Sequence, residues 1–198
     1  MSAIEVRSVD SLPVERWRNG GGVTRTIAAN GAHWRISLAE VERNGPYSRF
    51  EGIDRLSFVL RGAGVMLRET DSAVMLKPFE AAGYDGGAQW NATLIDGPVT
   101  ALNVMTARGR YRVTIRAITE PVSVLRGCSV AVVALQAVCA WRTSDGDAEG
   151  NVEANQFLIA ENLDRAIQFS PVVPAIDEPQ RKTLPVLVTI EPAGTQEC

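Results

Sequence analysis

The sequence predicts an all-β protein, and three observations carry that prediction. Short runs rich in β-branched residues recur along the chain. Turn residues separate these runs, as in Asn44-Gly45-Pro46 and Asp96-Gly97-Pro98. No stretch shows the 3.6-residue apolar spacing of an amphipathic helix. Many short strands at this spacing are typical of β-sandwiches and β-barrels.

The predicted strands follow one another along the whole chain. They are short runs rich in β-branched residues, and Gly, Pro, Asn and Asp in the connections interrupt them. The predicted strands are 3–9, 23–28, 33–42, 56–61, 64–69, 73–77, 88–96, 101–106, 111–118, 122–125, 128–141, 152–160, 165–169 and 184–191. The most apolar run, 128–141, is too short to span a bilayer. We expect it to form two buried strands.

Two segments of the first half resemble two segments of the second. "LSFVLRGAGVML" (56–67) is similar to "CSVAVVALQAVCAW" (128–141), because both hold two strands around a short turn. "ALNVMTARG" (101–109) is similar to "LPVLVTIEPAG" (184–194). Two copies of a jelly-roll unit, with a seam near residues 107–120, would explain the pattern. Chance resemblance between two β halves is the alternative.

Composition and charge argue against several classes of function. The 198 residues are 45% hydrophobic and 22% charged, with a formal net charge of −3. No basic surplus is present for binding nucleic acid or anionic lipid. The N-terminal segment lacks a positively charged leader followed by an apolar stretch, so we expect no secretory signal. We expect a cytoplasmic protein that binds neither nucleic acid nor membrane.

The few cysteines and the single histidine give little support for a metal centre. Cys128, Cys139 and Cys198 show no CxxC spacing, and we expect them to be reduced thiols. His33 stands beside a predicted turn and is expected at the surface. Because metal sites need several converging ligands, we expect no metal and no other cofactor.

Three consecutive glycines in "RWRNGGGVTRT" (16–26) raise the question of what the backbone approaches there. The run is no P-loop, because no Lys follows Gly22, and no dinucleotide fingerprint, because Arg25 occupies the required glycine position. Two interpretations stay open. The glycines either form a tight entry into the next strand, or they turn several N–H groups toward an anion.

Alternation along the next strand places Arg25 on the same apolar face as Val23 and Ile27. A buried guanidinium needs a partner, because an unpaired buried charge is very costly. Glu40, on the apolar face of the following strand, can supply an internal ion pair. The alternative is a carboxylate ligand, which suits the fork of an arginine.

Two further features leave a structural and a functional interpretation open. The connection "NGPYSRFEGIDR" (44–55) carries Phe50 and Arg55 and is either a lid over the core or a functional loop. Asn103 lies in an apolar strand and needs hydrogen-bond partners, from the backbone or from a ligand.

These motifs resemble the HutD/Ves family. "WRNGGGVTRTIA", "WRISLAEVERNGPYSRFEGIDRLSFVLRGAGVML" and "GPVTALNVMTARG" match it in order and spacing over residues 14–110. The resemblance implies a bicupin, two RmlC-like jelly-roll β-barrels in one chain. The first barrel would span 1–110 and carry the NGGGVTR motif, and a second, degenerate barrel would span 111–198.

The resemblance also implies a function. HutD members accompany histidine-utilisation genes, lack the cupin metal ligands, and are proposed to bind N-formylglutamate in a regulatory capacity. We therefore expect a metal-free protein that binds a small carboxylate and is more plausibly not an enzyme. The ligand-binding residues that the resemblance implies are Asn19, Gly20, Gly21, Gly22, Thr24, Arg25, Ser37, Phe50, Arg55 and Asn103. The chain departs from the family at Gly87 and Ala101, where the family tends to have Asp.

Two other functions stay open. One is a cofactor-free isomerase or lyase, acting on a small acid or sugar, in which Glu40, Tyr47 or His33 serves as acid or base. The other is a stress-related structural protein without a ligand. Because two barrels present strand edges that need cover, we also expect a homodimer.

Overall fold

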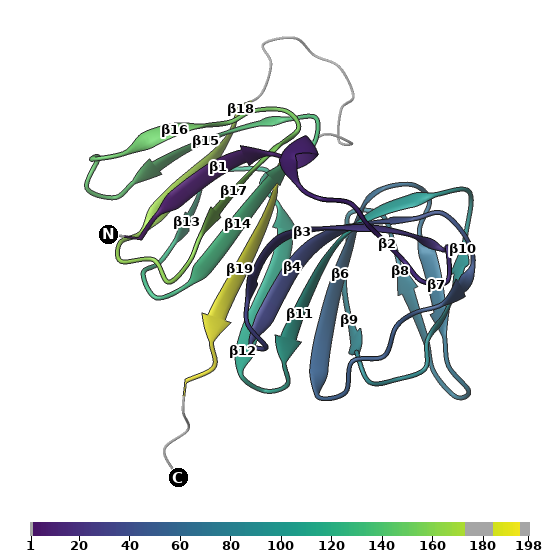
Figure 1. Ribbon diagram of the computed structural model, residues 1–198. Helices are drawn as coiled ribbons and strands as arrows, with labels where there is room; N and C mark the ends of the chain where they lie inside the picture. Colours follow the sequence, from purple (N-terminus) through teal and green to yellow (C-terminus); the bar gives the residue numbers. More distant parts are fainter. Residues whose placement is uncertain (1, 173–183, 195–198) are drawn as a thin grey trace. The chain divides into compact units, whose positions relative to one another are not determined.

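A computed structural model describes residues 2–172 and 184–194 (Figure 1). Apart from a short 3-10 turn at Val9–Ser11 (η1), the regular structure in these ranges is β-strand. The all-β prediction is confirmed. The chain divides into two compact units, one of Leu12–Tyr111 and one of Met1–Ser11 with Arg112–Cys198. Each is described by itself below.

The unit of Leu12–Tyr111 contains two sheets. Their strand orders are β2-β3-β4-β11-β6-β9 and β5-β10-β7-β8. The strands are β2 (Glu15–Arg16), β3 (Gly22–Asn30), β4 (Trp34–Val41), β5 (Gly45–Pro46), β6 (Ile53–Arg61), β7 (Val65–Arg68), β8 (Ala73–Leu76), β9 (Ala81–Asp85), β10 (Asn91–Leu94) and β11 (Val99–Ala107). The central strands β4 and β11 are buried on both faces, which explains why their sequences are almost continuously apolar.

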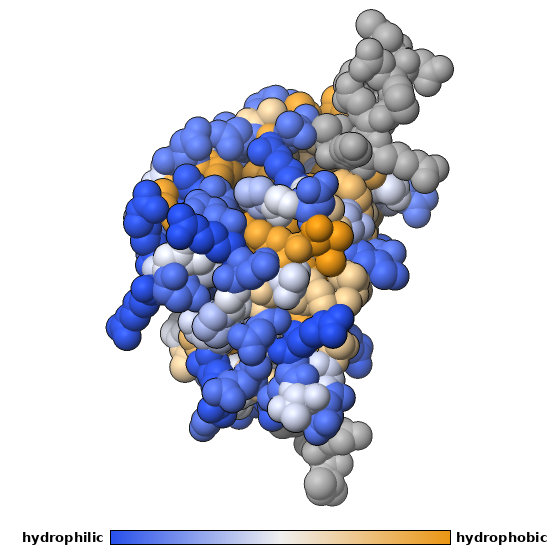
Figure 2. Space-filling model, turned by 90° about the vertical axis from the view of Figure 1, so that its right-hand side faces the viewer, coloured by the Kyte–Doolittle hydropathy of each residue, from blue (hydrophilic) through white to orange (hydrophobic). Residues whose placement is uncertain are grey.

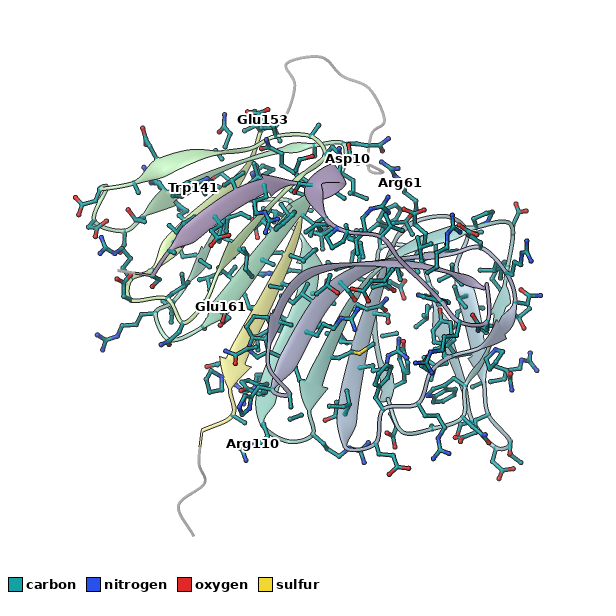
Figure 3. All side chains as sticks on the ribbon, in the orientation of Figure 1. Asp10, Arg61, Arg110, Trp141, Glu153 and Glu161 are labelled. Carbon is teal, nitrogen blue, oxygen red and sulfur yellow. The ribbon has the colours of Figure 1, made fainter. Side chains whose placement is uncertain are left out.

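The other unit also contains two sheets, with the orders β1-β17-β14-β19-β12 and β13-β18-β15-β16. The strands are β1 (Ile4–Ser8), β12 (Tyr111–Ala117), β13 (Val122–Val124), β14 (Ser129–Ala134), β15 (Val138–Thr143), β16 (Glu149–Val152), β17 (Gln156–Ala160), β18 (Ile167–Val172) and β19 (Val186–Pro192). A cluster of buried residues, among them Phe169 and Leu158, fills its core. Asp10, which Figure 3 labels beside η1, accepts a hydrogen bond of 2.7 Å from the Asn155 amide.

The two units share one strand order. In the first unit β4-β11-β6-β9 form one run of neighbours and β5-β10-β7-β8 form the other. Adding eight to each label gives β12-β19-β14-β17 and β13-β18-β15-β16, which are the neighbours in the second unit. The strands left over, β1, β2 and β3, extend the sheets at their edges. The predicted internal repeat therefore exists at the level of topology.

The structure differs from the predictions in several places. The strands β2, β5 and β9 stand where the sequence predicts none: β2 and β5 are only two residues long, and Gly83 interrupts the alternation of β9. The predicted strand 152–160 is divided between β16 and β17 by a turn at Asn155, which has a φ of 63°. The residues of β1, expected in the first domain, pair with β17 of the other unit.

Figure 2 shows a hydrophobic patch bordered by hydrophilic residues on one face. Cys128 and Cys139 are free, and burial raises the pKa of the Cys139 thiol to about 11. Cys198 lies outside the described residues. In the described ranges, no helix is long and apolar enough to cross a membrane.

Candidate functional site

A pocket of about 540 Å³ opens in the unit of Leu12–Tyr111. Its walls come from the segment before β3, from the connection that follows β5, and from one face of the six-stranded sheet. The residues that line it are Glu15, Arg16, Trp17, Arg18, Asn19, Thr24, Arg35, Ser37, Ala39, Pro46, Tyr47, Ser48, Phe50, Arg55, Asn103 and Met105. Six of the ten predicted ligand-binding residues are among them: Asn19, Thr24, Ser37, Phe50, Arg55 and Asn103.

The register of the sheet brings two arginines to this pocket. On β11, Met105 stands opposite Arg35 of β4 and opposite Arg55 of β6. These three residues therefore form one row across the sheet. Since all three line the pocket, the row presents a cation on each side of a thioether.

Arg55 is the most unusual of the lining residues. It is 7% exposed, and its Nε is buried without a hydrogen-bond partner. Its guanidinium carbon lies 5.0 Å from the ring centroid of Tyr84, 5.2 Å from that of Tyr47 and 5.9 Å from that of Phe50. No carboxylate among the described residues pairs with it. Aromatic faces compensate part of the charge, but a buried cation also requires an anion.

Arg35 is the second pocket arginine that the six-stranded sheet supplies. Its Nη2 lies 3.7 Å from Glu15 Oε2, and both side chains are partly exposed. Its Nε is buried and has no hydrogen-bond partner. A long ion pair of this kind contributes little to stability, so Arg35 keeps hydrogen-bonding capacity for a ligand.

The next row of the sheet is polar and buried. Asn103 stands opposite Ser37 and opposite Ser57, all three being less than 9% exposed. Ser57 Oγ donates to Asn103 Oδ1 at 2.5 Å and lies 2.9 Å from the Tyr84 hydroxyl. Asn103 therefore has a side-chain hydrogen-bond partner, Ser57, whereas the sequence predicts a partner from either the backbone or a ligand.

The three glycines do not line the pocket, contrary to the expectation from the sequence. They form a tight turn: Gly20 has a φ of 66°, and its N–H donates to the Trp17 carbonyl at 3.0 Å. A Cβ on Gly22 would overlap the backbone carbonyl oxygen of Glu40. The N–H of Gly21 donates to Asn19 Oδ1 at 2.9 Å. The backbone therefore approaches β4 and its own turn.

This turn positions the segment before β3, which forms one wall of the pocket. Asn19 Nδ2 donates to the Pro46 carbonyl at 3.0 Å, which fastens the turn to β5. Trp17 Nε1 donates to Thr24 Oγ1 at 2.7 Å, and the Trp17 and Tyr47 rings pack nearly perpendicular with their centroids 5.9 Å apart. Trp17, Asn19 and Tyr47 all line the pocket. The glycine turn therefore contributes to the site by positioning these side chains, although the glycines themselves do not line it.

Arg25 forms the internal ion pair. Its Nη1 donates to Glu40 Oε1 at 2.6 Å, and neither residue lines the pocket. Arg25 and Glu40 share one face of the sheet, as the alternation predicts. They do not line the pocket because it lies on the opposite face, which carries Thr24 and Ser37. Arg16 and Arg18 also line the pocket but are exposed, whereas Arg55 is the buried arginine there and has no anionic partner among the described residues.

The groups that could act as acid or base are poorly placed for chemistry. Glu40 pairs with Arg25, and His33 lies at a turn with its ring 6.5 Å from that of Tyr111. Of the three residues that the sequence offered as acid or base, only Tyr47 lines the pocket, and burial raises its pKa above the usual value. Tyr47 therefore carries its proton across the physiological range, and its hydroxyl is able to donate a hydrogen bond.

The two departures from the family pattern lie beside the pocket. Gly87 N donates to Asp85 Oδ1 at 2.7 Å, and this bond, with Arg108, holds the pKa of Asp85 below its usual range. Ala101 is 2% exposed in the row of Ala39 and Val59, so the core at this position is apolar.

The pocket does not fit a transition metal. Glu15 is its one carboxylate, and no histidine or cysteine lines it. Within residues 2–172 and 184–194, no three His, Cys, Asp or Glu side chains form a group that could hold a metal ion.

The equivalent position in the other unit is apolar. Its strands β14 and β19 correspond to β6 and β11, and Val130, Val132 and Leu187 on them are completely buried in one cluster. A more open cavity of about 700 Å³ in this unit borders Trp141, which is labelled in Figure 3. A Cβ on the neighbouring Gly150 would lie 3.2 Å from the Trp141 indole. None of the predicted ligand-binding residues lies there.

Four residues at or beside the pocket were not predicted from the sequence: Ser57, Tyr84, Arg35 and Glu15. The available signal was a polar residue inside an apolar strand, as for Ser57 in "LSFVL". The same signal identified Asn103.

Comparison with known proteins gives a consistent result. The HutD family model matches residues 10–172. An uncharacterised 21.2 kDa protein from the hutC 3′ region of Pseudomonas putida is 33% identical over 119 residues, which are 57% of this chain and 63% of that protein. Protein Ves of Citrobacter koseri is 35% identical over 120 residues, with the same coverage of 57% and 63%. The matched segment thus spans less than two thirds of these relatives.

Solved structures extend the similarity to nearly the whole chain. A conserved protein of unknown function from Pseudomonas aeruginosa has a TM-score of 0.82 and 25% identity, covering 97% of this chain and 100% of that chain. HutD from Pseudomonas fluorescens, in a formate condition, has a TM-score of 0.76 and 21% identity with the same coverage. A cupin 2 conserved barrel domain protein from Leptotrichia buccalis has a TM-score of 0.56 and 9% identity, covering 94% of this chain and 96% of that chain, which indicates a cupin-like fold.

Proposed function

Because the chain belongs to the HutD family, we propose that it binds a small carboxylate in the pocket of the Leu12–Tyr111 unit. The observation that carries the proposal is Arg55. Its guanidinium is buried, faces three aromatic rings and pairs with no carboxylate of the described chain. A carboxylate is the ligand whose geometry and charge match an arginine fork.

The rest of the pocket suits such a ligand. Asn103 and Ser37 present polar groups in the row next to Arg55, and Trp17 and Tyr47 supply aromatic walls. The volume of about 540 Å³ accommodates a molecule the size of N-formylglutamate. Arg35 offers a second cationic contact for a ligand with more than one acidic group.

We further propose that binding serves regulation of histidine utilisation and that no reaction is catalysed. The relative from P. putida is described by its place in the hutC 3′ region, and the P. fluorescens structure is a HutD protein. Glu15 is the one carboxylate among the lining residues and no histidine lines the pocket, which supports binding over turnover. We propose that the protein works without a metal.

We also propose that each unit is a cupin-type barrel, which makes the chain a bicupin. The repeated strand order of the two units supports this architecture. The likeness to a cupin barrel protein supports it independently. The apolar interior of the second unit is in keeping with a degenerate barrel.

The test compares wild type with Arg55→Met, in which the side chain keeps its length and loses its charge. Formate and N-formylglutamate are titrated by isothermal calorimetry, and the free energy of unfolding of the ligand-free protein is measured in urea. We expect Arg55→Met to reduce affinity about tenfold to hundredfold, because a charge-assisted hydrogen bond of about 1.5–3 kcal/mol is lost. Ligand-free stability should not fall, because an unpaired buried charge is removed.

Arg25→Met is the matched control, since it removes an arginine of the same unit that is outside the pocket. Its affinity for both ligands should equal that of wild type. Wild-type protein that binds neither ligand, or binding that survives Arg55→Met unchanged, would contradict the proposed site.

A further inference from the structure

The buried hydrogen bonds behind the pocket have a defined direction. The Tyr84 hydroxyl has Ser57 Oγ, 2.9 Å away, as its only hydrogen-bond partner among the described residues. Tyr84 is 8% exposed, and a buried O–H without an acceptor is costly. The phenol therefore donates to Ser57, and the proton of Ser57 is left for its other neighbour.

That neighbour is Asn103, whose amide orientation follows. Ser57 Oγ lies 2.5 Å from an atom of the Asn103 amide. Because the hydroxyl already accepts from Tyr84 and donates its own proton here, the amide atom that receives it is the oxygen, Oδ1. The amide nitrogen of Asn103 then has no partner among the described residues, and Asn103 lines the pocket.

The result is a pocket that presents hydrogen-bond donors side by side. Asn103 pairs with Ser57, and Arg55 is two residues before Ser57 on the same strand and face. Such diagonal neighbours lie within reach of a common ligand. The Arg55 guanidinium has donors only, and the Asn103 amide, held by its oxygen, offers its N–H groups.

We propose that Ser57 and Tyr84 are positioning residues that make the pocket select an ionised carboxylate over a carboxamide of the same shape. This inference rests on the proposed carboxylate site. A carboxylate accepts hydrogen bonds at both oxygens. A carboxamide turns an NH₂ group toward at least one donor, and it leaves that donor unpaired. Without Ser57, the Asn103 amide can rotate and accept from the ligand, which admits the carboxamide.

The experiment measures this selectivity as a ratio. Dissociation constants of formate and formamide, and of acetate and acetamide, are measured by NMR titration of the ¹⁵N-labelled protein. We expect wild type to bind each carboxylate at least about tenfold more tightly than its amide. Ser57→Ala should lower the ratio by about threefold, while Arg55 preserves part of the preference for the anion. Tyr84→Phe, which keeps the ring beside Arg55 and Trp90, should lower it by less.

Ser129→Ala is the matched control, because Ser129 is also a buried serine with a side-chain hydrogen bond, and it lies in the other unit. Its ratio should equal that of wild type. A Ser57→Ala protein that binds carboxylate and amide in the wild-type ratio, or that weakens both equally, would overturn the inference and leave the carboxylate site standing. If Ser57→Ala does not fold, an unchanged ratio in Tyr84→Phe would overturn it. Wild-type protein that binds neither member of a pair would refute the proposed function and this inference with it.

Discussion

The positive charges of Arg25 and Arg55, two arginines of the same unit, are compensated in different ways. Arg25 has a side chain 23% exposed and an ion pair of 2.6 Å with Glu40, whose side chain is 46% exposed. Arg55 is more deeply buried and has three aromatic rings in place of an anion. The difference follows from the two faces of the sheet. One face brings Glu40 beside Arg25, and the other leaves Arg55 open to whatever enters the pocket.

Because the Arg25–Glu40 ion pair is partly exposed, we expect it to contribute little to the free energy of unfolding. A double-mutant cycle with Arg25→Ala and Glu40→Ala should give a coupling free energy of about 0.5–1 kcal/mol, because partly exposed ion pairs are screened by solvent. Urea unfolding of the four proteins measures it. A coupling several times larger would mean that the pair is effectively buried.

At the scale of the element, the backbone conformation of the turn at Gly20–Gly22 positions one wall of the pocket. The entry to β3 lies so close to β4 that a side chain on Gly22 would overlap the backbone of Glu40. The carbonyl of Gly21 accepts from the N–H groups of Glu42 and Arg43 at 2.9 and 3.2 Å. This close approach fixes the segment that carries Trp17.

The three glycines should therefore tolerate alanine unequally. Gly22→Ala should destabilise the protein by about 3 kcal/mol or more, because the β3–β4 ladder must separate. Gly20→Ala should cost about 1–2 kcal/mol, because its positive φ is disfavoured while the space around it is open. Urea unfolding of both variants tests this order, and equal costs would show that steric overlap at Gly22 is relieved.

Alternation along a strand predicts which residues share a face, because its period is local. The sequence thus placed Glu40 on the face of Arg25 and identified Asn103 as a buried polar residue. It could not bring Ser57, Tyr84 and Asn103 together, because Ser57 lies 27 residues from Tyr84 and 46 from Asn103. Those contacts depend on the order β11-β6-β9, which arises from non-local pairing.

At the scale of the whole molecule, the chain begins in one unit, builds the other, and returns. The strand β1 pairs with β17 over five residues, from Ile4–Ala160 to Ser8–Gln156. Ile4 and Val6 pack against the apolar cluster of that unit. The pocket lies entirely within Leu12–Tyr111. A boundary read from the repeat alone assigns β1 to the wrong unit, because the repeat contains no counterpart of that strand.

This division predicts that damage to β1 lowers stability without changing the pocket. Val6→Asp puts a carboxylate into the apolar cluster of the second unit and should destabilise the protein by about 2–4 kcal/mol. Glu5→Gln, on the exposed face of the same strand, should change stability by less than about 0.5 kcal/mol. Thermal unfolding measures both effects, and NMR titration with formate at a temperature where each variant is folded measures the pocket. The affinity for formate should stay within about twofold of wild type in both variants, a difference of about 0.4 kcal/mol. A Val6→Asp protein that is folded but has lost formate binding would show that the pocket depends on the second unit.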